Sequence, residues 1–429
     1  MNKVQDFILT FIGIFLSYTF YNRIMYQSKE DIERYQFNKL QKLLIESGKH
    51  VPYYKKLFQE INFNPKTDFN SIKDLKKIPI LEQKIVRKDR NQFINKKYPF
   101  YIDMKTSGTS GTPFKASISF NHWVVEQAVI WRQWKSFNYN FRDKMAIIRS
   151  YSPKKNDKLI KVDLLRNFIF YSPYHLTDKN MEAYYEDMIK RDVKFLRGYP
   201  SSIKIFSEFC YRKNYKIQNL KGIFLASETL SENDKDFIRK VFKVPVVNHY
   251  GLAECIVMFG NIGSDQLLYS YDDYGYLETI ENKDNEHIVI GTNLNNYSMP
   301  LIRYNTNDRI VIKKNNIKSN INFKTIEKIS GRKNEYIVSL DYKIPVTNLY
   351  TIFAKYTDIT QFQIVQSSIS SINIIILCPD DKIDNIKNSL FKNLNFLQKK
   401  EINFKIEFSS NFIRTGEGKI PPFISYEKK

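Results

Sequence analysis

Apolar residues recur at helical intervals near the start of the chain. The range Asp31–Ser47 has polar residues between its apolar positions, which are Ile32, Tyr35, Leu40, Leu43 and Leu44. This spacing predicts an amphipathic helix. The short apolar pieces His50–Phe58 and Ile78–Leu81 contain prolines, as expected where the chain enters a larger domain.

From Tyr101 to about Gly331, short apolar runs alternate with helical patterns. The apolar runs are Met145–Ile148, Phe195–Leu196, Gly222–Ala226, Val244–Val247 and His287–Gly291, and a further strand is expected at Phe114–Phe120. Strands that alternate with helices predict a mixed α/β domain.

The residues after the Gly331-Arg332 turn follow the order strand, strand, helix, strand. The predicted elements are Phe362–Gln366, Ile372–Cys378, Lys382–Gln398 and Ile402–Phe408. Such a segment has the usual size of a small α+β domain. We therefore expect a large mixed α/β domain at 31–332 and a small α+β domain at 333–429, preceded by an apolar N-terminal segment at 1–30.

The N-terminal segment contains an uncharged, mainly apolar run, Phe7–Tyr21. A helix that spans a bilayer needs about 20 apolar residues, so this run is short for a span. Two interpretations carry equal weight: a helix that contacts a membrane surface through residues 1–21, and a helix that packs on the protein itself. A third interpretation, a transmembrane anchor, is less favoured.

Composition places the chain among folded proteins of more than one domain. It has 429 residues, of which 42% are apolar and 15% aromatic, unlike disordered chains. The formal charge of +22 raises the possibility of nucleic-acid binding. The basic residues are spread along the chain without a compact recognition motif, so we expect no nucleic-acid partner. An anionic membrane face or polyanionic substrates account for the charge equally well.

The cysteines indicate a reducing compartment. Cys210, Cys255 and Cys378 are widely separated and odd in number, so neither a disulfide framework nor a zinc site is indicated. We expect a cytoplasmic protein.

The sharpest local signal is Thr106-Ser-Gly-Thr-Ser-Gly-Thr-Pro113, in which two glycines and five hydroxyls precede a predicted strand. Glycine lets backbone N–H groups turn toward an anion, and the hydroxyls add donors, so the loop suits a polyphosphate. It matches neither the Walker A nor the GxGxxG pattern. A hydroxyl-rich surface loop is the alternative interpretation.

Further motifs follow this loop in a particular order. They are Ala226–Leu230 (ASETL), Asn248–Glu254 (NHYGLAE), Leu301–Asp308 (LIRYNTND), Ser330–Arg332 (SGR) and Thr415–Lys419 (TGEGK). With these motifs the chain resembles the adenylate-forming superfamily, and most closely its phenylacetate-CoA ligase-like branch with the CapK-type capsular polysaccharide proteins. The resemblance runs from about Tyr35 to the C-terminus.

The resemblance implies a role for each matching residue. It assigns the ATP phosphates to Thr106, Ser107, Gly108, Thr109, Ser110, Gly111 and Thr112, and the adenine end to Ser227, Glu228, Thr229, Tyr250 and Gly251. It makes Glu254 a Mg²⁺ ligand, Asp308 the acceptor of hydrogen bonds from the ribose hydroxyls and Arg332 a neighbour of the ribose and the hinge. Lys419 becomes the catalytic lysine.

The same residues have plainer interpretations outside the motifs. Tyr250 could be a core aromatic residue, Glu254 a solvated surface residue, and Asp308 and Arg332 members of surface ion pairs. Lys419 is one of 67 basic residues.

The chain departs from the family pattern at three places. Asn307 stands where relatives usually have Gly, and we expect a left-handed backbone there because Asn adopts it readily. Asn334 replaces the usual hinge Asp, and Ile420-Pro-Pro-Phe follows the lysine in place of a basic and aromatic run.

The implied function is ATP-dependent activation of a carboxylic acid. The acid and MgATP would give an acyl adenylate and pyrophosphate, and the acyl group would pass to coenzyme A, a carrier protein, an amine or a sugar in cell-surface polysaccharide synthesis. The small domain would be mobile, rotating between the two half-reactions. The alternatives are a non-catalytic scaffold of a polysaccharide assembly and a nucleotidyltransferase that releases the adenylate.

Overall fold

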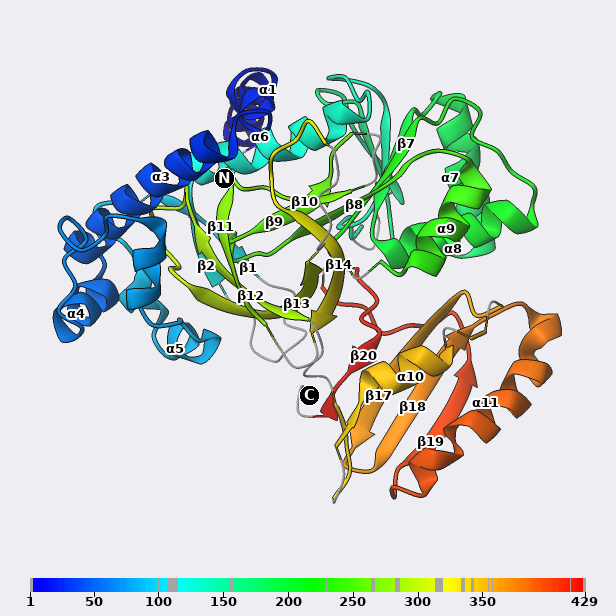
Figure 1. Ribbon diagram of the computed structural model, residues 1–429. Coiled ribbons are helices and arrows are strands. Elements are labelled where there is room, and N and C mark those ends of the chain that lie inside the picture. Colours follow the sequence, from blue (N-terminus) through cyan, green and yellow to red (C-terminus); the bar gives the residue numbers. More distant parts are fainter. Residues whose placement is uncertain are drawn as a thin grey trace. The chain divides into compact units, whose positions relative to one another are not determined.

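The chain has a mixed α/β fold with a large sheet and a smaller C-terminal sheet (Figure 1). The computed structural model describes residues 3–98, 100–105, 115–153, 158–228, 230–263, 267–281, 286–312, 319–332, 336–340, 343–353, 355–356, 358–416 and 418–426. Two compact units are present: Met1–Thr106, Phe114–Tyr139 and Asn248–Gly331 belong to the first, and Asn140–Val247 and Arg332–Lys429 belong to the second.

The first unit begins with helices. They are α1 (Lys3–Tyr18), α2 (Phe20–Ile24), α3 (Lys29–His50), α4 (Pro52–Glu60), α5 (Gln83–Lys88) and α6 (Phe120–Ser136), with 3₁₀ turns η1 (Ile72–Lys77) and η2 (Arg90–Phe93). The Ser28 side chain caps α3 by accepting a hydrogen bond from the Asp31 backbone N–H at 3.1 Å. The amphipathic helix expected over Asp31–Ser47 is confirmed, and its apolar stripe enters the core of the unit.

Helix α1 packs against α6 in the first unit (Figure 1). The contact is close because small residues line it. A Cβ atom added at Gly13 would lie 2.6 Å from the Gln127 Cβ and 2.8 Å from the Val124 carbonyl oxygen. Any larger side chain at position 13 would therefore push the two helices apart.

A buried ion pair fixes the chain that follows α1. The Arg132 guanidinium contacts Asp273 at 2.5 Å, and both side chains are fully buried. Arg132 also donates to the Tyr21 carbonyl oxygen at 2.8 Å. Removing one partner of such a pair leaves an uncompensated buried charge, so this network holds the N-terminal segment in place.

The strands of the first unit are mainly antiparallel. They are β1 (Tyr101–Lys105), β2 (Lys115–Ser119), β8 (Val246–Gly251), β9 (Met258–Asn261), β10 (Leu268–Ser270), β11 (Gly275–Glu281), β12 (His287–Asn293), β13 (Tyr304–Ile312) and β14 (Thr325–Arg332). Their order is β11-β12-β13-β14-β10-β9-β8, and β1 and β2 form a separate hairpin. The predictions at Phe114–Phe120 and His287–Gly291 correspond to β2 and β12, whereas β1, β9, β10, β11, β13 and β14 were not identified from the sequence.

The first part of the second unit is a parallel sheet covered by helices. Its strands are β3 (Met145–Ile148), β4 (Ile160–Asp163), β5 (Phe168–Tyr171), β6 (Phe195–Gly198) and β7 (Gly222–Ala226), in the order β7-β6-β3-β5-β4, and only the edge strand β4 is antiparallel. The helices are α7 (Asp178–Lys190), α8 (Pro200–Arg212) and α9 (Glu232–Phe242). The strands predicted at Met145–Ile148 and Gly222–Ala226 are confirmed with the same bounds, and the strand expected at Val244–Val247 is β8, which begins two residues later.

The C-terminal part of the second unit is the smaller sheet with α11 beside it (Figure 1). Its elements are β15 (Tyr336–Val338), β16 (Lys343–Pro345), α10 (Val346–Phe353), β17 (Gln361–Ser368), β18 (Ser371–Leu377), η3 (Asp380–Lys382), α11 (Ile383–Gln398), β19 (Asn403–Phe408) and β20 (Phe423–Ile424). The sheet order is β19-β18-β17-β20. The predicted order of strand, strand, helix and strand is confirmed, while the domain boundaries at 30 and 332 stay predictions.

Within the described ranges, none of the helices combines the length and the apolar content that crossing a bilayer requires.

Candidate active site

The expected phosphate loop, Thr106–Thr112, lies outside the described residues, as does Thr229. Of Arg332 the structure describes the backbone, as the last residue of β14. The site is therefore built from the remaining predicted residues, which lie in the two units.

In the first unit, Tyr250 and Asp308 meet. The Tyr250 hydroxyl donates a hydrogen bond to Asp308 Oδ2 at 2.6 Å, and the Tyr250 ring stacks on Phe259 with centroids 4.9 Å apart. Gly251, the next residue and the last of β8, is exposed. The residues expected at the adenine and the ribose are thus brought together from β8 and β13.

The backbone before Asp308 has the conformation expected from the sequence. Asn307 has a φ of 60°, in the left-handed region that Asn tolerates better than most residues. The Asp308 N–H is bonded to the Thr306 hydroxyl at 3.1 Å. This turn aims the Asp308 carboxylate toward Tyr250, so the replacement of Gly by Asn307 is compatible with the motif's geometry.

Glu254 lies just after β8 and is buried, with 4% of its surface exposed. The Tyr304 hydroxyl donates to its Oε1 at 3.4 Å, so the solvated-surface interpretation of Glu254 is wrong. A carboxylate is the ligand type that a hard cation such as Mg²⁺ prefers. The residue therefore suits a metal that accompanies a nucleotide.

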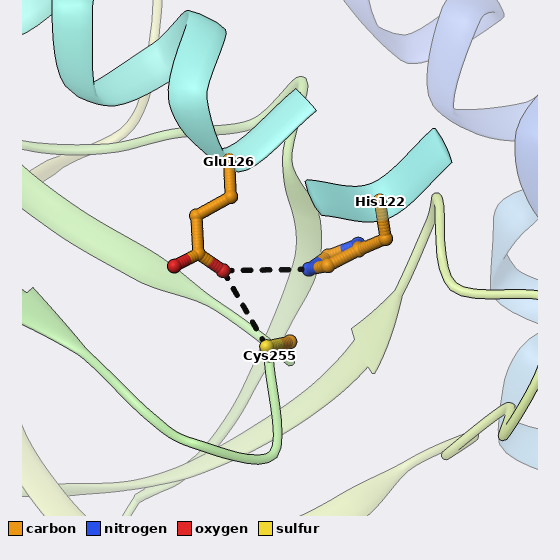
Figure 2. A group of neighbouring side chains, drawn as sticks. All are labelled: His122, Glu126 and Cys255. Atoms are coloured by element: carbon orange, nitrogen blue, oxygen red, sulfur yellow. Dashed lines mark hydrogen bonds and ion pairs between the residues drawn. The ribbon is translucent and has the colours of Figure 1, made fainter. Parts of the chain in front are cut away.

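The residue after Glu254, Cys255, forms a side-chain cluster with His122 and Glu126 of α6 (Figure 2). Glu126 Oε2 lies 3.8 Å from His122 Nε2 and 3.5 Å from Cys255 Sγ. The Tyr274 hydroxyl lies 3.0 Å from the same histidine nitrogen and donates to Glu126 at 3.2 Å. The cluster could not be predicted from the sequence because Cys255 lies far along the chain from His122 and Glu126.

Burial sets the charge state of the cluster. It lowers the pKa of His122 to about 3, and it raises the pKa of the Cys255 thiol, with Glu126 adding to the effect. A protonated thiol is a poor metal ligand and a poor nucleophile. We therefore interpret the cluster as a hydrogen-bonded network that fixes the backbone after Glu254, where Cys255 has a φ of 56°.

In the second unit, Ser227 and Glu228 follow β7. Ser227 has a φ of 75°, a strained conformation of the kind that is often found at functional sites. The Glu228 carboxylate accepts hydrogen bonds from the Ser201 N–H at 2.9 Å and the Ser201 hydroxyl at 3.1 Å. It also accepts one from the Ile420 N–H at 3.1 Å. Glu228 thus joins the start of α8 to the residue after Lys419.

Burial and hydrogen bonds act in opposite directions on the pKa of Glu228. Burial raises the pKa of its carboxyl above the usual value, while the hydrogen bonds from Ser201 and Ile420 and the charge of Lys419 oppose that shift. The contacts therefore favour the ionised form that burial penalises.

Lys419 lies in the segment between β19 and β20, in a tight turn. The Thr415 N–H donates to the Lys419 carbonyl oxygen at 2.9 Å, and the Lys419 N–H donates to the Thr415 hydroxyl at 3.2 Å. Gly418 has a φ of 88°, and a Cβ there would lie 2.8 Å from Pro173 and 3.1 Å from the Tyr174 ring. Only glycine fits this close approach without strain.

Two cations lie against one aromatic ring in this unit. The Lys419 ammonium is 5.7 Å from the centre of the Tyr199 ring, and the Arg149 guanidinium is 5.2 Å from it. Arg149 also donates to the Ser227 hydroxyl at 3.4 Å. Positive charge is therefore concentrated beside Ser227, as a site for an anionic group requires.

Three residues of the site were not predicted from the sequence: Arg149, Tyr199 and Ser201. Tyr199 and Ser201 flank the proline that begins α8, directly after a predicted apolar strand. The sequence feature that could have identified Tyr199 and Ser201 is a predicted strand followed directly by the start of a helix. Polar groups gather at that point, the carboxyl edge of a parallel sheet.

Comparisons with known proteins show a distant relative and a shared fold. Protein CapK of Staphylococcus aureus is 24% identical over 388 residues, which is 87% of this chain and 83% of CapK. No family model matches the sequence.

Among solved structures, 2-hydroxyisobutyryl-CoA ligase in the postadenylation state with R3-HIB-AMP superposes with a TM-score of 0.69 at 12% identity. The match covers 94% of this chain and 91% of that chain. The same ligase in complex with 2-HIB-AMP and CoA in the thioesterification state gives 0.61 at 13% identity, with the same coverage. The chain is a distant homologue of CapK and has the fold of the adenylate-forming CoA ligases.

Proposed function

We propose that the protein uses ATP to activate a carboxylic acid as an acyl adenylate and then transfers the acyl group to an acceptor. The observation that carries this proposal is the grouping of Lys419 and Arg149 around Tyr199, beside Ser227. Two cations at this position suit a reaction in which negative charge builds up between a carboxylate and a phosphate.

In the first half-reaction, a carboxylate oxygen of the acid would attack the α-phosphorus of ATP. The new bond is the acyl–phosphate bond, and the bond from the α-phosphorus to the bridging oxygen of pyrophosphate breaks. Lys419 would stabilise the charge on the carboxylate and on the α-phosphate oxygens in the transition state. A cation that acts mainly in the transition state raises the turnover rate more than it tightens substrate binding.

The other predicted residues would bind and orient the nucleotide. The Tyr250 ring offers a face to the adenine, and the Asp308 carboxylate accepts hydrogen bonds from the ribose hydroxyls. Glu254 would hold a Mg²⁺ ion, which would offset the phosphate charge when bound with ATP. Thr106–Thr112 would surround the β- and γ-phosphates, and Arg332 would lie near the ribose.

We assign Glu228 a positioning role. Its carboxylate oxygens accept hydrogen bonds from Ser201 and Ile420, so it acts on the segment that carries Lys419. Tyr174 is a second tether, because its hydroxyl donates to the Gly416 carbonyl oxygen at 2.8 Å.

The acceptor would be coenzyme A, a carrier protein, an amine or a sugar, and the product would enter the synthesis of a cell-surface polysaccharide such as capsule or O-antigen. The resemblance to CapK-type proteins of the phenylacetate-CoA ligase-like branch supports this role. An enzyme that modifies cytoplasmic precursors of such a polymer would act at the inner face of the cytoplasmic membrane, and we propose this location for the protein.

A screen of pyrophosphate release tests the proposal. The protein would be incubated with MgATP and a panel of carboxylic acids, amino acids and uronic acids, beside Lys419→Ala and a control, Lys405→Ala, at an exposed lysine of β19. We expect acid-dependent release that falls about a hundredfold in Lys419→Ala and stays unchanged in Lys405→Ala.

Two other outcomes would contradict the proposal. No release with any acid would favour a non-catalytic scaffold. Release of pyrophosphate without consumption of any thiol, amine or sugar acceptor would favour a nucleotidyltransferase that stops at the adenylate.

A further inference from the structure

The outward face of α1 is apolar from Ile8 to Phe15. The side chains of Ile8, Phe11, Ile12 and Phe15 are 51%, 53%, 43% and 63% exposed. Their spacing of three, four and seven residues puts them on one side of the helix. Soluble helices normally direct such a stripe into the core, so this surface, which we call the α1 face, needs a partner.

Helix α1 is packed on the protein, so detachment of the helix does not explain why its apolar face is exposed. Its opposite side carries Thr10, Gly13 and Ser17, which are buried, and Gly13 allows the close contact with α6. The carbonyl of Tyr21 is bound by the buried Arg132. The fold thus buries Thr10, Gly13 and Ser17 together with Ile14, and it leaves Ile8, Phe11, Ile12 and Phe15 exposed.

The α1 face also includes Tyr18, the last residue of α1, and Phe20, the first residue of α2, which are 39% and 43% exposed. Scaled by whole side-chain areas, these residues and the four named above expose an apolar area on the order of 500 Å². Patches of that size on a monomer usually mark an interaction site.

Cations border the α1 face, and the nearest acidic residues in the sequence are Asp6 before it and Glu30 and Asp31 after it. Residues 7–29 contain no Asp or Glu, whereas Arg23 and Lys29 are exposed near the end of the stripe. The Lys135 ammonium of α6 lies 3.7 Å from the centre of the Tyr18 ring, at the border of the face. The whole chain carries a formal charge of +22.

We propose that the α1 face inserts into the surface of a membrane that contains anionic lipids. Apolar side chains on one side of a helix with cations at its border are the pattern of helices that lie in the bilayer interface, and anionic headgroups attract such cations. A second copy of the chain fits less well, because the pairing would bring two strongly basic surfaces together. The proposal is independent of the acid chemistry.

Vesicle flotation of the full chain tests the proposal. The vesicles would be phosphatidylcholine alone and phosphatidylcholine mixed in equal parts with phosphatidylglycerol. We expect binding to the mixed vesicles that the double variant Phe11→Ser/Phe15→Ser weakens by about a hundredfold, since each phenylalanine contributes about a tenfold effect when it leaves water. Deletion of residues 1–21 is a poorer test, because it would uncover α6 and remove the Tyr21 carbonyl that accepts a hydrogen bond from Arg132.

A matched control and a charge variant separate the two contributions. Leu164→Ser/Leu165→Ser changes two residues that are 75% and 57% exposed in the second unit, and it should bind vesicles like the unmodified protein. Arg23→Gln should weaken binding to the mixed vesicles about fivefold and leave binding to phosphatidylcholine unchanged. Thermal unfolding of each variant checks that the fold is intact.

Three results would overturn the proposal. The first is absence of the full chain from floated mixed vesicles. The second is equal vesicle binding by the Phe11→Ser/Phe15→Ser variant and the unmodified protein. The third is a dimer in sedimentation velocity that the same variant dissociates, which would make the α1 face a contact between copies of the chain.

Discussion

The contact between Glu228 and the Lys419 segment gives a quantitative prediction. In Glu228→Ala the Ile420 N–H loses its acceptor, and so do the N–H and the hydroxyl of Ser201. A hydrogen bond to a charged group contributes about 1.5 to 3 kcal/mol. The equilibrium constant for docking of the Lys419 segment therefore falls by roughly tenfold to a hundredfold or slightly more, and we expect the rate of adenylate formation to fall by up to that factor.

The half-reactions separate this effect from general damage. With the acid identified by the pyrophosphate screen, adenylate formation would be measured in single turnover, and acyl transfer would be measured from preformed adenylate. We expect a large loss in the first step and little change in the second. Glu228→Gln keeps an acceptor oxygen without the charge, so its loss should be about tenfold at most.

Hydrogen exchange of the Ile420 amide provides a readout without any substrate. Its exchange should accelerate in Glu228→Ala and remain at the unmodified rate in Glu232→Ala, a control at an exposed carboxylate of α9. An equal exchange rate of the Ile420 amide in Glu228→Ala and in the unmodified protein would refute a role of Glu228 in holding this segment. An equal loss in both half-reactions would refute its specific role in acid activation.

Four further predictions concern single residues. Gly418→Ala should slow adenylate formation, measured in single turnover, because a Cβ would meet Pro173 and Tyr174; an unchanged rate would argue against a role for this close contact in placing Lys419. Asp308→Ala should weaken ATP binding, measured by calorimetry, by about 1.5 to 3 kcal/mol, and added Mg²⁺ should not restore it. Glu254→Ala should instead raise the metal concentration needed for half-maximal activity, with partial rescue at high Mg²⁺ or Mn²⁺; identical metal titrations for the two variants would remove the metal assignment. His122, whose pKa burial lowers to about 3, remains neutral in the fold while the unfolded chain takes up a proton below about pH 6.5. The free energy of unfolding, measured by urea titration at a series of pH values, should therefore fall below that pH by up to about 1.4 kcal/mol per pH unit. In His122→Gln it should depend less steeply on pH.

Local patterns were sufficient for an amphipathic helix and for strands that are buried on both faces. The helical spacing over Asp31–Ser47 predicted α3, and the apolar runs Met145–Ile148 and Gly222–Ala226 predicted β3 and β7 with the correct bounds, because both are central strands with both faces buried. Strand β13 was missed although its buried and partly exposed positions alternate. Polar residues such as Asn305 and Thr306 fill those positions, so hydrophobicity alone does not reveal the alternation.

The candidate site was predictable as a set of residues but not as a set of contacts. Motif order singled out Tyr250, Asp308 and Lys419, and the left-handed turn at Asn307 follows from the properties of Asn. The hydrogen bond from Ile420 to Glu228 joins residues 192 positions apart, and no local pattern encodes such a pairing. The same holds for His122 and Cys255, which only the fold brings together.

The most direct test of the central claim is acid-dependent exchange of labelled pyrophosphate into ATP, because this exchange requires reversible formation of an acyl adenylate. The account predicts exchange with at least one acid of the panel, lost in Lys419→Ala and retained in Lys405→Ala. Exchange that proceeds equally in Lys419→Ala, or that is absent with every acid while ATP still binds, would contradict it.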